Sequence, residues 1–258
     1  MVGDALWVEK RATDVSTFGG QGARGDDRQW RLCLHIDDIL IYTRTREEHL
    51  EKIKEVLERL EAAGLRISLE KLEWVRGEVR YLGYVIGAGV LKMDSEKVDA
   101  ISKIVLPAET KVDGHYRPNL RKQIRRFLGA AGFYRRFAKD FAALTAPLTE
   151  LTKTTERIAW KNEHTEAWKE LQERMASYPI LRQPNSTKEH FVDTDASNVG
   201  LGAALMQRSE DGTPHPVAYA SRKLTPAEQT YSTREQEALS SSRSRSLIVF
   251  WPGDDLRQ

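Results

Sequence analysis

The chain has 258 residues, of which 40% are hydrophobic and 30% are charged, a composition that fits a globular protein and not a disordered one. Because 40 Lys and Arg stand against 38 Asp and Glu, the net charge of +2 excludes a globally basic protein, and only a local cluster could indicate nucleic-acid binding. One cysteine excludes a disulfide framework and a multi-cysteine zinc site, and no apolar run is as long as a membrane span.

The start of the chain shows no signal-peptide pattern, so we expect an intracellular protein of the cytoplasm or nucleus with no membrane partner. Residues 1–30 are polar and lack a sustained hydrophobic period. We therefore expect them to be poorly ordered.

The next segment, LCLHIDDILIYTR, places the adjacent Asp37 and Asp38 between two apolar strand candidates. Two aspartates between strands are typical of a hairpin turn, because Asp tolerates turn geometry. The alternative is a divalent-metal site at a strand tip, where clustered carboxylates hold Mg²⁺ for phosphoryl transfer. Taken alone, the two residues favour the turn.

A helix is predicted over residues 46–63, because apolar residues form one stripe and Gly64 follows to end it. The stripe consists of Leu50, Ile53, Leu57 and Leu60. Residues 78–93 predict a hairpin, in which EVRYLGYVI and VLKM flank a Gly-Ala-Gly turn at 87–89. A second helix follows, from about 95 to 104.

The segment from Arg117 to Lys139 holds eight basic residues and no acidic one, and four aromatic residues are interleaved with them. Helices are predicted here, broken near 129–132 and at Pro147, and another amphipathic helix at 165–178. Two interpretations stay open. Aromatic residues at helical spacing usually face a core while the arginines are solvated, but a one-sided excess of positive charge also suits a surface that follows phosphates.

After about residue 186 the pattern changes to strands, and a helix is predicted to start near Thr225. FVDTDAS places Asp193 and Asp195 on the same side of a strand, and YSTREQEAL places Glu235 and Glu237 early in a helix. Strand and helix carboxylates that face each other could hold two metal ions for phosphodiester hydrolysis. In isolation, these four residues favour solvent-facing charges.

In this order, the motifs resemble the pol polyprotein of gypsy-type LTR retrotransposons. HIDDILIYTRTREEHL is similar to the palm motif of the family's reverse transcriptase, YLGYVI to the hairpin that grips the primer, and RRFLGAAGFYRRFAKDFAALTAPLTELTK to its thumb and connection. FVDTDASNVGLGAALMQ, PVAYASRKLTPAE and YSTREQEAL resemble the opening of the tethered ribonuclease H domain. The resemblance covers roughly residues 31–239.

The resemblance implies four carboxylates that act in catalysis and hold Mg²⁺. They are Asp37 and Asp38 in the palm, and Asp195 and Glu237 in the ribonuclease H part. Leu82 and Gly83 would belong to the primer grip. The implied partner is RNA–DNA hybrid or duplex nucleic acid, and the basic run supplies the candidate contacts. These are Arg121, Lys122, Arg125, Arg126, Arg135 and Arg136.

We therefore predict an α+β chain. Residues 31–105 would form the C-terminal half of a reverse-transcriptase palm with the primer-grip hairpin, 106–185 a helical thumb and connection, and 186–258 a truncated ribonuclease H-like α/β domain. Residues 1–30 have no match in the resemblance.

Departures from the family pattern bear on activity. A reverse transcriptase needs a third palm carboxylate, from a strand upstream of the adjacent aspartates. None of Asp4, Asp14, Asp26 and Asp27 lies in an apolar strand context that would match it. His35 stands where the family usually has Tyr, and the helix with Glu237 gives way to SSSRSRS in place of an apolar stripe. The family activity is RNA-directed DNA polymerase with ribonuclease H, and we expect this copy to be inactive.

Three hypotheses for the biological role stay open. The chain could be an enzyme whose missing carboxylates come from pol segments in another chain. It could be a domesticated nucleic-acid-binding protein that uses the basic segment. It could also be a decayed copy with no role.

Overall fold

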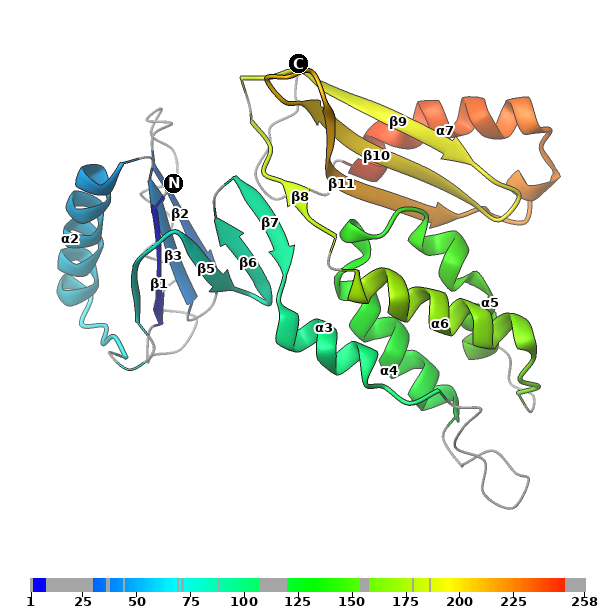
Figure 1. Cartoon of the computed structure of the whole chain (residues 1–258), viewed down its shortest axis with the longest axis horizontal. Helices are drawn as coiled ribbons and strands as arrows, with labels where there is room; N and C mark the ends of the chain where they lie inside the picture. Colours follow the sequence, from blue (N-terminus) through cyan, green and yellow to red (C-terminus); the bar gives the residue numbers. More distant parts are fainter. Residues whose placement is uncertain are drawn as a thin grey trace. The chain divides into compact units, whose positions relative to one another are not determined.

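The structure is a computed structural model that describes residues 2–7, 30–35, 38–43, 45–68, 70, 72–87, 89–106, 120–153, 158–177, 179–185 and 187–248. The chain divides into two compact units, Met1–Asp94 and Ser95–Gln258 (Figure 1). Both units combine helices and strands, which confirms the predicted α+β class.

The first unit contains a four-stranded antiparallel sheet with the order β2-β3-β1-β4. Its strands are β1 (Val2–Trp7), β2 (Trp30–His35), β3 (Asp38–Thr43) and β4 (Glu73–Arg76). Strand β3 is buried on both faces, because Ile39 and Ile41 pack in one apolar cluster and Leu40 packs in another. A strand covered on both sides needs an unbroken apolar run, which explains ILIY after the two aspartates.

The expectation of poor order for residues 1–30 does not hold for Val2–Trp7. This segment forms β1 and pairs with β3 along its whole length, from Val2 opposite Thr43 to Trp7 opposite Asp38. A strand of six residues carries too short a pattern to be recognised in a polar context. Residues 1 and 8–29 lie outside the described residues.

Helix α2 (Arg46–Ala62) begins at Thr45, whose Oγ1 accepts a hydrogen bond from the Glu48 N–H at 3.3 Å. Gly64 follows the helix with a φ of +68°, as predicted for its end. The buried stripe shares Ile53 and Leu60 with the predicted one, and its other two positions each lie one residue earlier. It consists of His49, Ile53, Val56 and Leu60.

Leu50 belongs to the predicted stripe but is 53% exposed. His49 takes its place, because its Nδ1 lies 3.1 Å from the Thr43 Oγ1 inside the core. A polar residue that is satisfied by a hydrogen bond can occupy a core position, and a count of apolar residues misses it.

The predicted hairpin at 78–93 is a three-stranded antiparallel meander of β5 (Glu78–Tyr81), β6 (Tyr84–Gly87) and β7 (Val90–Met93). The extra turn lies at Leu82 and Gly83, which both have positive φ angles, +50° and +79°. Positive φ at both central residues is the geometry of a two-residue type I′ turn. Gly87, predicted to lie in a turn, instead ends β6.

The second unit begins with the helices α3 (Ser95–Ser102), α4 (Leu120–Phe133), α5 (Phe141–Lys153) and α6 (Asn162–Ala176), with a short 3₁₀ turn η3 (Arg135–Phe137) between α4 and α5. The break predicted near 129–132 comes slightly later, where α4 ends at Phe133, and the break predicted at Pro147 does not occur. Two glycines are tolerated in α4 because four buried residues still hold one face. Pro147 lies inside α5, where tertiary packing outweighs the lost backbone hydrogen bond.

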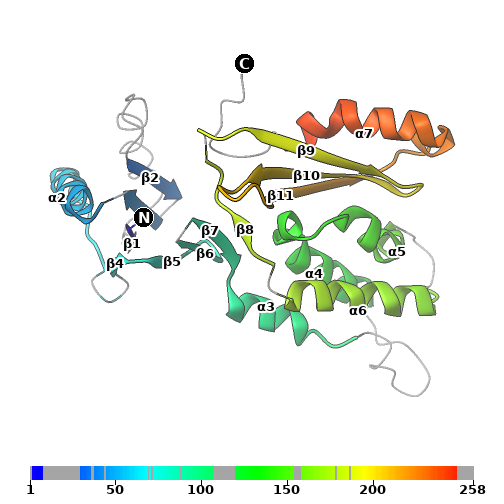
Figure 2. The same cartoon turned by 45° about the horizontal axis from the view of Figure 1, so that its top comes forward.

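The rest of the unit contains the short strand β8 (Leu181–Arg182) and a sheet with the order β11-β10-β9, called the half-sheet below. Its strands are β9 (His190–Ala196), β10 (Gly200–Arg208) and β11 (Pro214–Lys223), all antiparallel. Figures 1 and 2 show helix α7 (Thr233–Ile248) on one face of the half-sheet and α5 on the other.

The helix predicted from Thr225 starts later, because a 3₁₀ turn η4 (Glu228–Thr230) precedes α7. It also continues through SSSRSRS to Ile248, where we expected the pattern to fail. Ser240 explains part of this length: it is buried, and its hydroxyl donates to the carbonyls of Asp195 at 3.1 Å and Gly202 at 3.3 Å. Hydrogen bonds to the half-sheet take the place of an apolar stripe.

Candidate nucleic-acid interface and carboxylate positions

Helix α4 presents an exposed, partly basic face. Its buried residues, which recur at helical spacing, are Leu120, Ile124, Phe127 and Ala131. Four of its exposed residues lie directly opposite that buried face: Lys122, Arg126, Gly129 and Phe133. At 3.6 residues per turn these four positions fall within about 60° of one another. They are called the α4 face below.

The aromatic residues of this segment serve two purposes. Phe127, Tyr134 and Phe137 are at most 2% exposed and belong to the core, and the Phe127 ring stacks on Trp168 with centroids 3.7 Å apart. Phe133, in contrast, is 50% exposed. Both interpretations of the basic run are therefore compatible with the structure: one side of α4 is core, and the other offers cations and an aromatic ring.

No packing contact within the protein explains why residue 129 is a glycine. A Cβ at this position would have no other atom within 4 Å, so no described neighbour requires the small residue. A glycine inside a helix costs roughly 1 kcal/mol relative to alanine. Its bare backbone lets a ligand approach the α4 face closely.

The other predicted basic contacts differ in their surroundings. Arg135 is exposed, whereas Arg121 and Arg136 are half-buried. Arg125 is exposed, but its Nη2 donates a hydrogen bond to the Thr152 carbonyl at 3.1 Å. The six basic residues predicted from the sequence therefore do not form one uniform surface.

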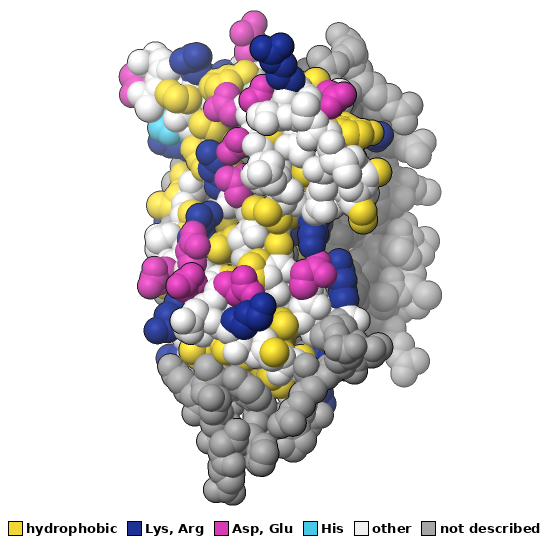
Figure 3. All heavy atoms as spheres, turned by 90° about the vertical axis from the view of Figure 1, so that its right-hand side faces the viewer, with side chains coloured by type: hydrophobic (Ala, Val, Ile, Leu, Met, Phe, Trp, Pro, Cys, Tyr) yellow, Lys and Arg dark blue, Asp and Glu magenta, His cyan; other side chains and the backbone are white. Residues whose placement is uncertain are grey.

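Charge is mixed elsewhere on the chain. Figure 3 shows one face of the molecule, on which acidic, basic and apolar side chains are interspersed. This agrees with the net charge of +2, so any nucleic-acid site has to be local.

Of the two predicted palm carboxylates, the structure describes Asp38, which is the first residue of β3. Asp38 is half-buried and stands opposite His35 in β2 and Trp7 in β1. Asp37 lies outside the described residues. Asp4, which we expected to lack a strand context, lies in β1 but pairs with Ile41. It is thus three pairs, or about 10 Å, along the sheet from Asp38.

The predicted primer-grip residues form the tip of the turn between β5 and β6. Leu82 is half-buried and packs against a cluster of Leu40, Val79 and Tyr81. A left-handed conformation at a leucine costs roughly 1–2 kcal/mol. Packing of the side chain offsets this cost, while Gly83 takes the second left-handed position without strain.

A side-chain hydrogen bond joins the strand of Asp195 to the helix of Glu237. Ser240, one turn after Glu237, donates its hydrogen bond to the Asp195 carbonyl. Both carboxylates are exposed, as is Asp193. Asp195 in β9 is paired with Gly202 in β10, so the two positions lie on the same face of the half-sheet.

Hydrogen bonds fix the start of α7. The Ser232 N–H and O–H both donate to the Glu235 Oε2 at 2.8 Å, and these bonds lower the pKa of Glu235. This is a capping box, so Glu235 has a structural role. Upstream, the Arg222 guanidinium donates two bonds to Glu228 at 2.7 and 2.8 Å and lowers the pKa of Glu228 to about 2.

Sequence patterns missed Asp140, the residue before α5. Its φ of +54° is left-handed, a conformation that Asp tolerates better than most residues. A Cβ on Gly202 would collide with the Asp140 Oδ1, so the Asp140 carboxylate lies beside Asp195. Burial raises the pKa of Asp140, Lys139 lowers it, and the charge of Asp195 raises it further. The only sequence signal is a residue type that tolerates positive φ.

The described residues contain no group of three or more His, Cys, Asp or Glu side chains that could hold a metal ion. Carboxylates suit Mg²⁺ chemically. The described part offers them at Asp38, Asp195 and Glu237 without gathering three at one place. Within the same residues, no helix combines the length and apolar character that a membrane crossing needs.

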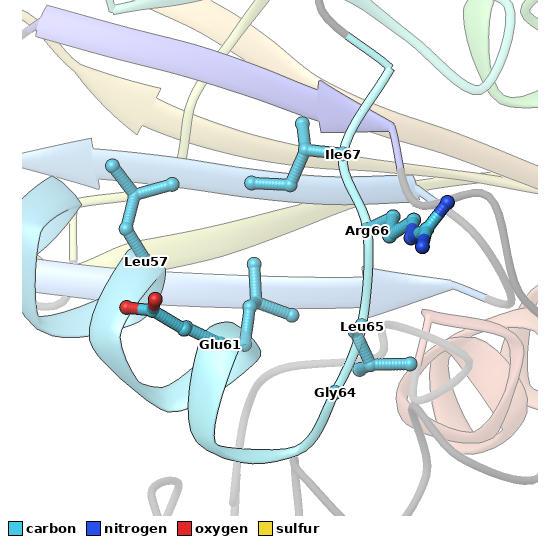
Figure 4. Close-up of a pocket in the computed structure, with 7 residues that line it drawn as sticks. Leu57, Glu61, Gly64, Leu65, Arg66 and Ile67 are labelled. Atoms are coloured by element: carbon cyan, nitrogen blue, oxygen red, sulfur yellow. The ribbon is translucent and has the colours of Figure 1, made fainter.

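A shallow groove of about 480 Å³ lies where α2 ends (Figure 4). Its lining consists of Leu57, Leu60, Glu61, Gly64, Leu65, Arg66 and Ile67. Figure 4 shows the Glu61 and Arg66 side chains on opposite sides of it. The groove contains none of the residues that the sequence predicted to be functional.

Two known families match this chain. The family described as "Reverse transcriptase (RNA-dependent DNA polymerase)" matches residues 15–86. The family described as "RNase H-like domain found in reverse transcriptase" matches residues 160–244. The first match covers β2, β3, α2, β4, β5 and most of β6, and the second covers α6, the half-sheet and most of α7.

Curated relatives include the transposon Tf2-3 and Tf2-4 polyproteins of Schizosaccharomyces pombe, each 32% identical over 220 residues. The alignment covers 85% of this chain but only 16% of each polyprotein.

Solved structures with the same fold include foamy viral protease–reverse transcriptases. One in complex with double-stranded DNA has a TM-score of 0.73 at 26% identity, and the match covers 92% of this chain and 46% of the foamy viral chain. One in complex with RNA/DNA hybrid has a TM-score of 0.73 at 20% identity, and the match covers 96% of this chain and 37% of the foamy viral chain.

Proposed function

We propose, from the premise that this chain belongs to the gypsy-type LTR retrotransposon polyproteins as a reverse transcriptase and ribonuclease H-like segment, that it binds RNA–DNA hybrid or duplex nucleic acid. The observation that carries the proposal is the α4 face. Two exposed cations there can pair with phosphates while an exposed aromatic ring contacts sugar or base, and Gly129 lets the duplex approach the helix backbone.

The foamy viral neighbours support a duplex as the ligand class. Their structures contain double-stranded DNA or RNA/DNA hybrid. Phosphate contacts carry no sequence information, so binding by the α4 face should be indifferent to sequence and steeply dependent on salt. Affinity should fall in the range of non-specific binders, about 10⁻⁴–10⁻⁶ M near physiological salt.

Fluorescence anisotropy with a labelled RNA–DNA hybrid at several salt concentrations tests this proposal. A Lys122→Gln, Arg126→Gln double variant removes two phosphate contacts, so the slope of log affinity against log salt should become shallower by about two units. Lys169→Gln removes an exposed lysine of α6 and is the matched control. Equal slopes for the double variant and the parent would show that the α4 face does not contact phosphates.

Catalysis by the 258-residue chain alone is not part of the proposed function. Reverse transcriptases and ribonucleases H generally use divalent metal ions, and Asp37, Asp38, Asp195 and Glu237 are the residues that would hold them here. Two-metal chemistry depends on several carboxylates at one place, and the described residues do not gather three. We therefore expect no primer extension and no hybrid cleavage with Mg²⁺ or Mn²⁺.

The assay for catalysis uses a primed RNA template, with a parallel reaction that includes a separately expressed upstream segment of a related polyprotein. Extension by the chain alone that disappears in Asp38→Asn would contradict the prediction. Extension only in the mixture would support completion of the palm by another chain, the second candidate function. A separate observation bears on the nuclease part: β9 is an edge strand among the described strands of the half-sheet, so a strand of another chain could pair with it.

A further inference from the structure

Arg125 and Arg126 are adjacent on α4 and are both exposed, but their environments differ. The Arg125 Nη2 donates to the carbonyl of Thr152, in the last turn of α5, at 3.1 Å. Carbonyls in the last turn of a helix have no partner within the helix, and a cation there also complements the helix dipole. Arg125 therefore caps α5, whereas Arg126 belongs to the α4 face.

Helix α5 is in turn attached to the half-sheet. Near its start, the Ala142 N–H donates to the Ser221 Oγ at 2.9 Å. Near its end, Glu150 forms an ion pair with Lys223, whose hydrogen bond is the main reason that the pKa of Glu150 is lowered. Both partners lie among the last three residues of β11, so the two contacts hold α5 against the end of that strand.

A close approach of backbones supports this attachment. A Cβ on Gly200 in β10 would lie 2.8 Å from the Arg222 carbonyl oxygen and 3.8 Å from the Ala143 nitrogen. The 2.8 Å distance means that the neighbouring strand β11 requires a glycine here, whereas 3.8 Å is ordinary van der Waals contact and places the start of α5 directly against β10.

We propose that Arg125 is a positioning residue for nucleic-acid binding: it does not contact phosphate, but ties the α4 face to α5 and through α5 to the half-sheet. The inference rests on the proposed function of the α4 face and divides the basic residues of that segment by role. Arg126 supplies charge to the duplex, and Arg125 holds the helix that presents it.

The experiment compares Arg125→Gln with its neighbour Arg126→Gln in the full chain, which makes each the matched control of the other. Both variants are measured by anisotropy with an RNA–DNA hybrid across several salt concentrations, and by amide hydrogen exchange of residues 141–153. Arg126→Gln should make the salt slope shallower by about one unit and leave exchange in α5 unchanged.

Arg125→Gln should leave the slope unchanged, weaken binding about two- to tenfold at every salt concentration, and speed exchange in the last turn of α5. That range is what the loss of one hydrogen bond can supply. Arg125→Lys keeps a cation and a donor at the Thr152 carbonyl, so it should restore both affinity and exchange protection.

A slope that becomes shallower by about one unit in Arg125→Gln would overturn the inference, because Arg125 would then contact phosphate. Unchanged exchange in α5 would also overturn it. If Arg126→Gln changes neither slope nor affinity, the proposed function of the α4 face fails, and the exchange data still decide whether Arg125 holds α5.

Discussion

His164 is a buried histidine in the first turn of α6, and its hydrogen bond determines which nitrogen is free of a proton. The Lys161 N–H donates to the His164 Nδ1 at 2.8 Å, so Nδ1 has to accept. Burial lowers the pKa of His164, the neighbouring Glu163 carboxylate raises it, and Lys161 lowers it. The lowered pKa and the hydrogen bond both favour the neutral ring.

Acidification should therefore weaken this helix start. Because the folded-state pKa lies below the ordinary value of 6.5, the stabilisation is fully present above pH 6.5 and is lost as the pH falls toward the folded pKa. His164→Gln keeps an acceptor for the Lys161 N–H but cannot titrate. As the pH is lowered from 7 to 5, the unfolding midpoint of the parent should fall relative to that of the variant. A constant difference over that range would contradict the prediction.

At the scale of elements, a single side chain of α6 caps the C-terminal end of α3. The Gln172 Nε2 lies 3.3, 3.0 and 3.0 Å from the carbonyl oxygens of Ile101, Ser102 and Ile104. The last carbonyls of a helix need donors from outside the helix. A side-chain amide has only two N–H groups, so the three carbonyls share them.

Replacement of Gln172 should loosen the end of α3. Gln172→Ala removes the donor and should cost about 1–3 kcal/mol of unfolding free energy, the net contribution of two hydrogen bonds at about 0.5–1.5 kcal/mol each. Gln172→Glu should cost more, because a carboxylate would face three carbonyl oxygens. Denaturant unfolding and amide exchange of residues 101–104 measure both effects, with the exposed Glu173→Ala as control. Equal stability of Gln172→Glu and the parent would rule out this role.

At the scale of the whole molecule, the half-sheet depends on elements that precede it in the chain. Helix α5 covers the face of the half-sheet opposite α7, and Ser221 and Lys223 of β11 bind it. A fragment that begins after α6 would leave that face and the edge of β9 open. Three strands with one helix bury little apolar surface by themselves.

Residues 186–258 expressed alone should therefore aggregate or show little amide-exchange protection, whereas residues 95–258 should unfold cooperatively. Thermal melting followed by circular dichroism, with hydrogen exchange on both fragments, tests the difference. Cooperative two-state melting of the shorter fragment would show that the half-sheet is an independent domain.

Much of this protein was predictable from short-range pattern. Helices α2, α4 and α6 follow apolar periodicity, Gly64 ends α2 as its residue type suggests, and ILIY marks a buried strand. The order of several motifs was enough to indicate the retrotransposon family and the α+β class. These features depend on residues close in sequence, whose spacing alone determines which face is apolar.

Only the tertiary structure decided the features that join distant residues. Strand β1 forms because β3 offers it a partner, and Leu82 adopts a positive φ because its side chain packs in a cluster. Arg125 and Thr152 are 27 positions apart, and Ala142 and Ser221 are 79 apart. Sequence alone shows that Arg125 and Arg126 are both basic. Their separate roles follow from three-dimensional position, because a hydrogen bond depends on distance in space and not on distance along the chain.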